Sequence, residues 1–148
     1  MQYSPEFKEK VINEVQEVKS LNKEIIVINA KDLLTKLILL GEVNSEILFK
    51  LANIETELGE YENAISHYLM VTETGNSSLE LYYNLAMSYA QIGNYMQALL
   101  AFQNGYKLDI DNYDLVFQIA MCYKELEVYD QAIKYLNLFI NKSPDDHV

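Results

Sequence analysis

The sequence predicts an all-α chain in which three helical hairpins stack into an α-solenoid, preceded by N-terminal helices. Three observations predict this fold: an internal period of 34 residues, small residues that recur on both helices of each copy, and helix-start and helix-stop residues at the ends of the copies. Half of the 148 residues are hydrophobic and only two are proline. That composition is typical of an ordered globular chain.

Residues 1–44 come first and are predicted to form helices that do not repeat the full pattern. Pro5 is a favourable first helical residue, and an apolar stripe then follows at helical spacing, formed by Phe7, Val11, Val15 and Val18. Covering the open end of the array as a cap and self-association are both compatible with this stripe.

The second half of this segment keeps part of the 34-residue register. Ala30, Leu34 and Leu37 lie one period before Ala64, Tyr68 and Val71, and Gly41 is a plausible helix cap. We therefore expect a degenerate fourth hairpin here. The stretch 25–29, IIVIN, is compatible with a strand, a bend or continuous helix.

The three full copies are residues 45–78, 79–112 and 113–146. They align without insertion or deletion, so each position can be compared across the copies. The positions that fall in the same register are Leu51/Leu85/Ile119, Ala52/Ala86/Ala120, Gly59/Gly93/Glu127, Tyr61/Tyr95/Tyr129, Ala64/Ala98/Ala132 and Tyr68/Phe102/Leu136.

Helix signals recur at the same places in the copies. Ser45, Ser78 and either Asp111 or Asn112 can cap the first helices, and glycine supplies the tight turn in two copies. The alanines of the first helices are expected to face those of the second helices, which lets the two backbones approach. Each hairpin then leaves a face exposed and must stack on the next one.

The second copy reads YYNLAMSYAQIGNYMQALLAFQNGYKLD and resembles the tetratricopeptide repeat family. The residues at the family's signature positions are Leu85, Ala86, Tyr89, Gly93, Tyr95, Ala98 and Phe102. The third copy adds Pro144, where the family ends its second helix. Two departures concern local geometry: Glu55 stands where an aromatic residue is usual, and Glu127 stands where glycine is usual.

The resemblance implies that binding occurs on the inner surface of the stacked first helices. The residues transferred by register are Glu46, Phe49, Asn53, Glu80, Tyr83, Asn84, Met87, Asp114, Phe117, Gln118 and Met121. Among them Phe49, Tyr83 and Phe117 form an aromatic column, with an acidic edge of Glu46, Glu80 and Asp114. A groove of this kind suits an apolar peptide or protein segment that carries basic residues. The alternative is that these side chains pack against their own neighbours.

One known use of such grooves is to clamp the acidic tail of heat-shock chaperones. Asn53 and Asn84 match the two asparagine positions, but Phe49, Asp114 and Gln118 stand where cationic residues are expected. A carboxylate clamp without cations does not hold an acidic peptide. The sequence therefore argues against that partner.

The composition disfavours other classes of function. The net charge is −11, so nucleic acid is a poor partner, and no segment is predicted to span or anchor in a membrane. Asp109, Asp111 and Asp114 lack the remainder of a calcium loop, His67 has no spaced metal-ligand partner, and Cys122 is the only cysteine. We expect no cofactor, no metal, no enzymatic activity and a cytoplasmic location.

The sequence thus predicts an adaptor or scaffold that binds a protein or peptide in its groove. One alternative is a small dedicated chaperone, similar in layout to the class II chaperones of type III secretion. Another is a structural homo-oligomer that assembles through the N-terminal helix or the open C-terminal end. The last copy finishes in SPDDHV without a covering helix, which predicts either that the chain is a piece of a longer protein or that this end is buried.

Overall fold

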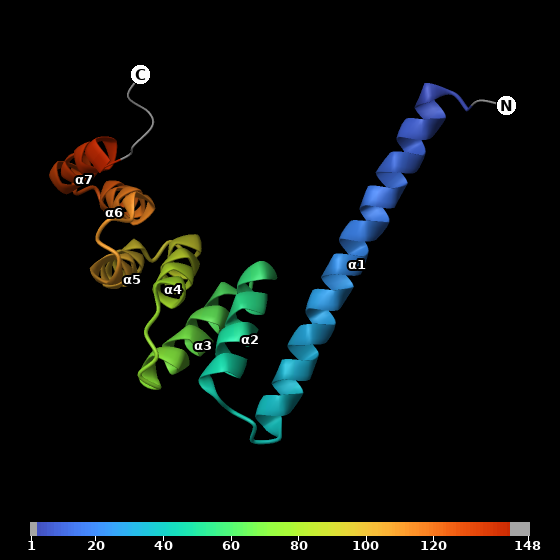
Figure 1. Cartoon of the computed structure of the whole chain (residues 1–148), viewed down its shortest axis with the longest axis horizontal. Helices are drawn as coiled ribbons and strands as arrows, with labels where there is room; N and C mark the ends of the chain where they lie inside the picture. Colours follow the sequence, from blue (N-terminus) through green and yellow to red (C-terminus); the bar gives the residue numbers. More distant parts are fainter. Residues whose placement is uncertain (1–2, 143–148) are drawn as a thin grey trace. The chain divides into compact units, whose positions relative to one another are not determined.

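The computed structural model describes residues 3–142, which form seven α-helices and no strand (Figure 1). This confirms the predicted all-α class. Pro144 and the C-terminal SPDDHV, for which the sequence makes predictions, lie outside the described residues. The helices are α1 (Pro5–Leu39), α2 (Ser45–Glu57), α3 (Tyr61–Glu73), α4 (Leu79–Gln91), α5 (Tyr95–Leu108), α6 (Tyr113–Glu125) and α7 (Tyr129–Lys142).

The chain divides into two compact units, residues 1–42 and 43–148. The first unit is the single helix α1, and none of its residues is buried. The prediction of a degenerate hairpin is therefore wrong, because the IIVIN stretch continues the helix. The physical reason is that no glycine or proline lies between Glu6 and Leu40 to break it. Gly41, at φ +87°, ends α1 as predicted.

The second unit is a stack of three hairpins, α2–α3, α4–α5 and α6–α7. Each helix packs on its hairpin partner, and α3 packs on α4 as α5 does on α6. The alanine positions of the repeat are buried in all three copies, as the sequence predicts: Ala52, Ala64, Ala86, Ala98, Ala120 and Ala132. Tyr68 and Phe102 are the two largest side chains among those that are fully buried.

The three hairpin turns share one backbone geometry. In each turn the second residue after the first helix has a left-handed conformation, with φ +78° at Gly59, +76° at Gly93 and +61° at Glu127. The following amide donates to the carbonyl five residues earlier, as Glu60 does to Glu55 at 2.8 Å and Val128 to Tyr123 at 2.9 Å. This is the Schellman arrangement. Glu127 thus adopts a conformation that usually requires glycine.

Side-chain caps begin the first helices of the hairpins. Ser78 and Asn112 accept hydrogen bonds from backbone amides three residues later, as predicted. In the first copy the cap is Asn44 and not Ser45, because the Asn44 amide oxygen accepts from the Ile47 amide at 2.9 Å. Ser45 is instead the first helical residue, and its hydroxyl accepts from Asn76 Nδ2 at 2.6 Å.

One pair of positions within the hairpin is filled differently in each copy. In the first copy Glu55, only 3% exposed, lies with its Oε2 2.7 Å from His67 Nδ1. The equivalent residues of the second copy are Tyr89 and Ala101. In the third copy Tyr123 and Tyr135 stack with ring centroids 5.6 Å apart. This contact between a carboxylate and an imidazole therefore takes the place of the aromatic residue that is usual at position 55.

Candidate functional site

The predicted aromatic column lies on the first helices of the three hairpins, and each of its rings is half-buried. Each ring contacts an aromatic ring of the second helix in its own hairpin. The centroid distances are 5.9 Å for Phe49–Tyr68, 5.7 Å for Tyr83–Phe102 and 5.3 Å for Phe117–Phe139. These contacts hold one side of each ring in the core and leave the other side accessible.

Tyr83 interacts with the acidic edge across the α4–α6 step. Burial raises the pKa of the Tyr83 hydroxyl, and the Asp114 carboxylate raises it further, whereas a hydrogen bond with Gln118 acts in the opposite direction. The structure therefore brings together three of the predicted residues, one from α4 and two from α6. The site at this step combines a phenol, a carboxylate and an amide.

Asn53 and Asn84 are joined to each other and to the core. Asn53 Oδ1 accepts from the Tyr68 hydroxyl at 2.6 Å and from Asn84 Nδ2 at 3.1 Å. Thr56 Oγ1 lies 3.2 Å from the Tyr68 hydroxyl and 3.4 Å from the hydroxyl of Ser88. The two amides thus connect α2, α3 and α4, and the Asn53 oxygen is already used.

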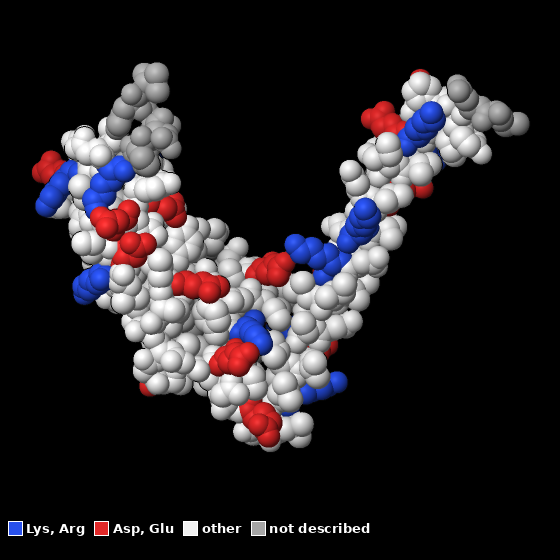
Figure 2. All heavy atoms as spheres, viewed as in Figure 1, with Lys and Arg blue, Asp and Glu red and all other residues white. Residues whose placement is uncertain are grey.

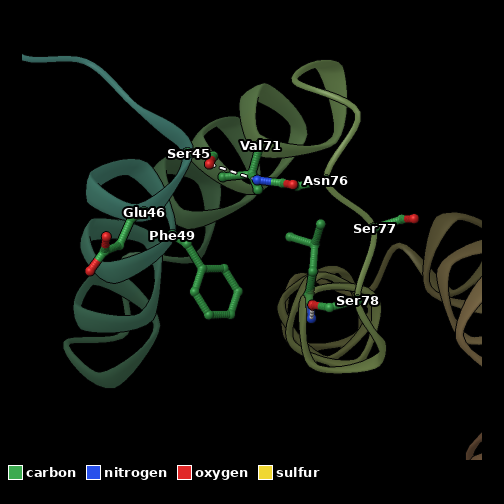
Figure 3. Close-up of a pocket in the computed structure, with 8 residues that line it drawn as sticks. Ser45, Glu46, Phe49, Val71, Asn76, Ser77 and Ser78 are labelled. Carbon is green, nitrogen blue, oxygen red and sulfur yellow. Dashed lines mark hydrogen bonds between the residues drawn. The ribbon is translucent and has the colours of Figure 1, made fainter.

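A cleft of about 290 Å³ opens beside the first ring of the column (Figure 3). The Phe49 ring points into the space between α2 and α4, while Glu46 points away from it. The Asn76–Ser45 hydrogen bond closes one wall. The lining residues are Ser45, Glu46, Phe49, Val71, Asn76, Ser77, Ser78 and Leu81. The cleft thus offers an apolar floor with hydroxyl and amide groups at its edge.

The three carboxylates of the acidic edge are all exposed, but they are not equivalent. Glu46 pairs with Lys50 at 2.7 Å, and this hydrogen bond and charge lower the pKa of Glu46. Within residues 3–142 no salt bridge involves Glu80 or Asp114. The edge is therefore unneutralised at the second and third copies.

The net charge is concentrated in the repeat array. Residues 1–42 hold six of the 11 lysines and seven of the 22 acidic residues, which leaves five lysines and 15 acidic residues for residues 43–148. The array thus carries −10 of the net charge of −11. Figure 2 shows its acidic side chains spread over the visible face and not gathered in one patch. A field of this sign attracts cationic partners.

Two predicted residues and two unpredicted ones complete the site. Met87 and Met121 lie on α4 and α6 and are half-buried. Phe139 was missed because Leu136 holds the aromatic place of the repeat register in the third copy. Asn76 was missed because it lies in the connection between two copies, where the sequence pattern gives no signal.

A second cleft, of about 330 Å³, lies between α3, α4 and α5 and was not predicted. Its lining includes Tyr82 and Tyr89 from α4 and Leu100 from α5. The sequence places Tyr89 at a signature position of the repeat and predicts no role for Tyr82. The only signal that could have indicated a cleft at these two tyrosines is the side of α4 on which they lie.

Cys122 and the three aspartates that were considered for other chemistry lie at structural positions of the repeat array. Burial, followed by the charge of Glu125, raises the pKa of the buried Cys122 thiol to about 11. Asp109 and Asp111 lie in the turn from α5 to α6, and Asp114 lies in the first turn of α6. No group of three or more His, Cys, Asp or Glu within residues 3–142 is placed to hold a metal ion. In the same part of the chain no helix is long and apolar enough to cross a membrane.

The stacked hairpins define an α-solenoid repeat protein, and sequence comparison identifies the kind of repeat. Family profiles described as tetratricopeptide repeat match residues 45–73, 79–112 and 114–146, well over half of the chain. The chain therefore belongs to the tetratricopeptide repeat family, whose members are typically interaction scaffolds and not enzymes. No curated protein matches the sequence.

Solved structures share this fold at low sequence identity. YrrB, described as a TPR protein with an unusual peptide-binding site, has a TM-score of 0.75 and 21% identity over 83% of this chain and 63% of YrrB. MamA (MSR-1) has a TM-score of 0.74 and 17% identity over 81% of this chain and 69% of MamA. MamA from Desulfovibrio magneticus RS-1, residues 41 to the end, has a TM-score of 0.74 and 13% identity over 90% of this chain and 75% of that protein. This chain thus spans less than two thirds of YrrB, and the likeness concerns the fold alone.

Proposed function

We propose that the array is a protein-interaction module that binds an apolar, lysine- or arginine-bearing peptide segment along the first helices of its hairpins. The observation that carries the proposal is the pairing of half-buried rings with exposed, unneutralised carboxylates at α4 and α6. Rings anchored on one side by the core lose little conformational entropy when they receive a ligand. The proposed role is that of an adaptor or scaffold and not of an enzyme.

The geometry supports a basic peptide over an acidic one. Asp114 lies close enough to Tyr83 to act on its pKa, so a cation placed there would contact a carboxylate and an aromatic face together. The Asn53 oxygen accepts two intramolecular hydrogen bonds, which adds to the absence of cationic residues as an argument against a carboxylate clamp. Affinity for the peptide should fall as salt is raised.

The test uses two synthetic peptides with the same apolar residues, one bearing lysines and the other glutamates. Fluorescence anisotropy should show the lysine peptide binding at least about tenfold more tightly, a difference of roughly 1.4 kcal/mol. Glu80→Lys/Asp114→Lys should abolish this preference. Tyr83→Ala/Phe117→Ala should weaken binding of the lysine peptide, with unfolding measured in parallel because both rings also contact the core.

A matched control separates the groove from the overall charge. Glu62→Lys/Asp130→Lys reverses two exposed carboxylates on the second helices α3 and α7 and changes the net charge equally. This control should retain the preference for the lysine peptide. If the groove and control variants lose it to the same extent, the attraction belongs to the whole acidic array and the proposed groove is wrong.

A further inference from the structure

Residues 7–28 of α1 carry an exposed apolar stripe that is interrupted at Glu14. Phe7, Val11, Val18, Leu21, Ile25 and Ile28 are each between 41 and 55% exposed. Helices of ordinary composition gain most of their stability by packing an apolar face against another element. A helix of this length with no buried residue therefore lacks the contact that its sequence is patterned for.

The stripe follows a seven-residue repeat. Val11, Val18 and Ile25 occupy one seam position, called a, and Phe7, Glu14, Leu21 and Ile28 occupy the other, called d. Six of these seven side chains are apolar. Alternating spacings of three and four residues are the pattern of a helix that packs against a second helix in a coiled coil.

The charges of α1 favour a second copy over a membrane surface. The helix holds six lysines and six acidic residues between Pro5 and Leu39. A membrane-surface helix needs a predominantly basic polar face, whereas Figure 2 shows lysines and acidic side chains mixed along α1. A neutral helix does not repel its own copy, although the array to which it is joined is strongly acidic.

We propose that α1 pairs with α1 of a second copy of this chain in an antiparallel two-stranded coiled coil. The seam then matches Val11 with the second copy's Leu21, Val18 with its Glu14, and Ile25 with its Phe7. In a parallel pair the two Glu14 carboxylates would face each other at a seam position, which is unfavourable. The antiparallel arrangement separates them.

Residues beside the seam support the same orientation. In an antiparallel pair, flanking positions of the same type face each other. Lys10 then faces the second copy's Glu24, and this contact occurs twice by symmetry. Val15, which is exposed and apolar, meets Val15 of the second copy. Glu17 also meets its copy, at an exposed flank where water and salt weaken the repulsion.

The first experiment compares two variants of the full chain that differ only in the face they charge. Val11→Asp/Ile25→Asp places two carboxylates in the seam, and Ile12→Asp/Ile26→Asp places two on the adjacent exposed residues outside it. Sedimentation equilibrium should show dimers for the wild type and for the second variant. The first variant should be monomeric, with array melting unchanged because α1 and the array are separate compact units.

The second experiment tests orientation. Lys10→Glu and Glu24→Lys should each weaken the dimer by roughly three- to tenfold, and the double variant should recover wild-type affinity. Residues 10 and 24 are 14 positions apart, about 21 Å along one helix, so recovery requires contact between chains. In a parallel dimer neither single variant would have this effect.

Three results would overturn the proposal. One is a monomeric wild type at hundreds of micromolar. Another is a dimer that both aspartate variants disrupt equally, or neither. The third is a monomer whose array melts earlier in Val11→Asp/Ile25→Asp than in the control variant, because α1 would then cover part of its own chain.

Discussion

The helix α1 and the repeat array are both rich in apolar residues, yet they use them differently. The helix α4, with 13 residues, buries Leu81, Leu85, Ala86 and Ser88, while α1, with 35 residues, buries none. The difference does not come from a lack of apolar residues in α1, since residues 25–28 read IIVI. It comes from the alanine positions, which let the helices of each hairpin approach closely and which have no hairpin partner in α1.

The largest expected effect compares two phenylalanines. Phe102→Ala should destabilise the array by about 3 to 5 kcal/mol, since the ring is 1% exposed and its loss leaves a cavity. Phe7→Ala should change array unfolding by less than ~0.5 kcal/mol, because Phe7 is 48% exposed. Urea denaturation followed by circular dichroism measures both. Equal losses would mean that α1 contributes to the array core.

The next effect tests close packing with one substitution at two alanines. Ala98→Leu should cost about 1 to 3 kcal/mol, because Ala98 is fully buried between the helices of a hairpin. Ala30 lies in α1 two repeat periods before Ala98. Ala30→Leu should lower the stability by less than ~0.5 kcal/mol, since the leucine side chain can extend toward solvent. An unchanged melting temperature for Ala98→Leu would show that the assigned register is wrong.

A smaller effect concerns the turns. Glu127→Gly should stabilise the third hairpin by about 1 kcal/mol, because φ +61° is strained for a residue with a Cβ atom. Gly93→Ala, at φ +76° in the equivalent turn, should destabilise by a similar amount. Thermal unfolding of the pair provides the measurement. Shifts of the same sign in both variants would contradict this account of the turns.

The smallest effect is a pH dependence. Burial, and then the Glu125 charge, raises the pKa of Cys122 to about 11, above its value of about 8.5 in an unfolded chain. The buried Cys122 thiol therefore contributes fully to the stability of the array at pH values below the thiol pKa of the unfolded chain. This contribution is lost as the pH rises toward 11. A thiol reagent at pH 8 should therefore modify Cys122 much more slowly than the exposed cysteine of a Ser20→Cys variant. Equal rates would show that Cys122 is accessible.

Much of the array could be predicted from the sequence, because in a repeat each position is read several times. The buried alanines, the turns at Gly59 and Gly93 and the caps Ser78 and Asn112 all follow from the 34-residue register. The same register misled the interpretation of α1. Ala30, Leu34 and Leu37 have helical spacing whether or not a hairpin forms. Only a helix-breaking glycine or proline could have distinguished a hairpin from one long helix.

The site was less predictable because its contacts cross between elements. The register placed Phe49, Tyr83 and Phe117 on equivalent positions, but it could not show that Asn53 and Asn84 bond to each other. Nor could it show that Phe139, and not the residue at the aromatic position, supports Phe117. Such contacts depend on side-chain direction between helices, which a pattern along one chain does not contain.

One pair of hairpin positions holds different residues in each copy, and this has a consequence for folding. The pairs are Glu55–His67, Tyr89–Ala101 and Tyr123–Tyr135. Near-identical repeats can pair with the wrong neighbour, and misassembly of this kind is a characteristic failure of repeat proteins. A first helix bearing Glu55 would lose its imidazole partner if it met the second helix of another copy, which has Ala101 or Tyr135 at that place. A buried carboxylate without a hydrogen-bond partner is costly, so the first hairpin favours its own second helix over those of the other copies.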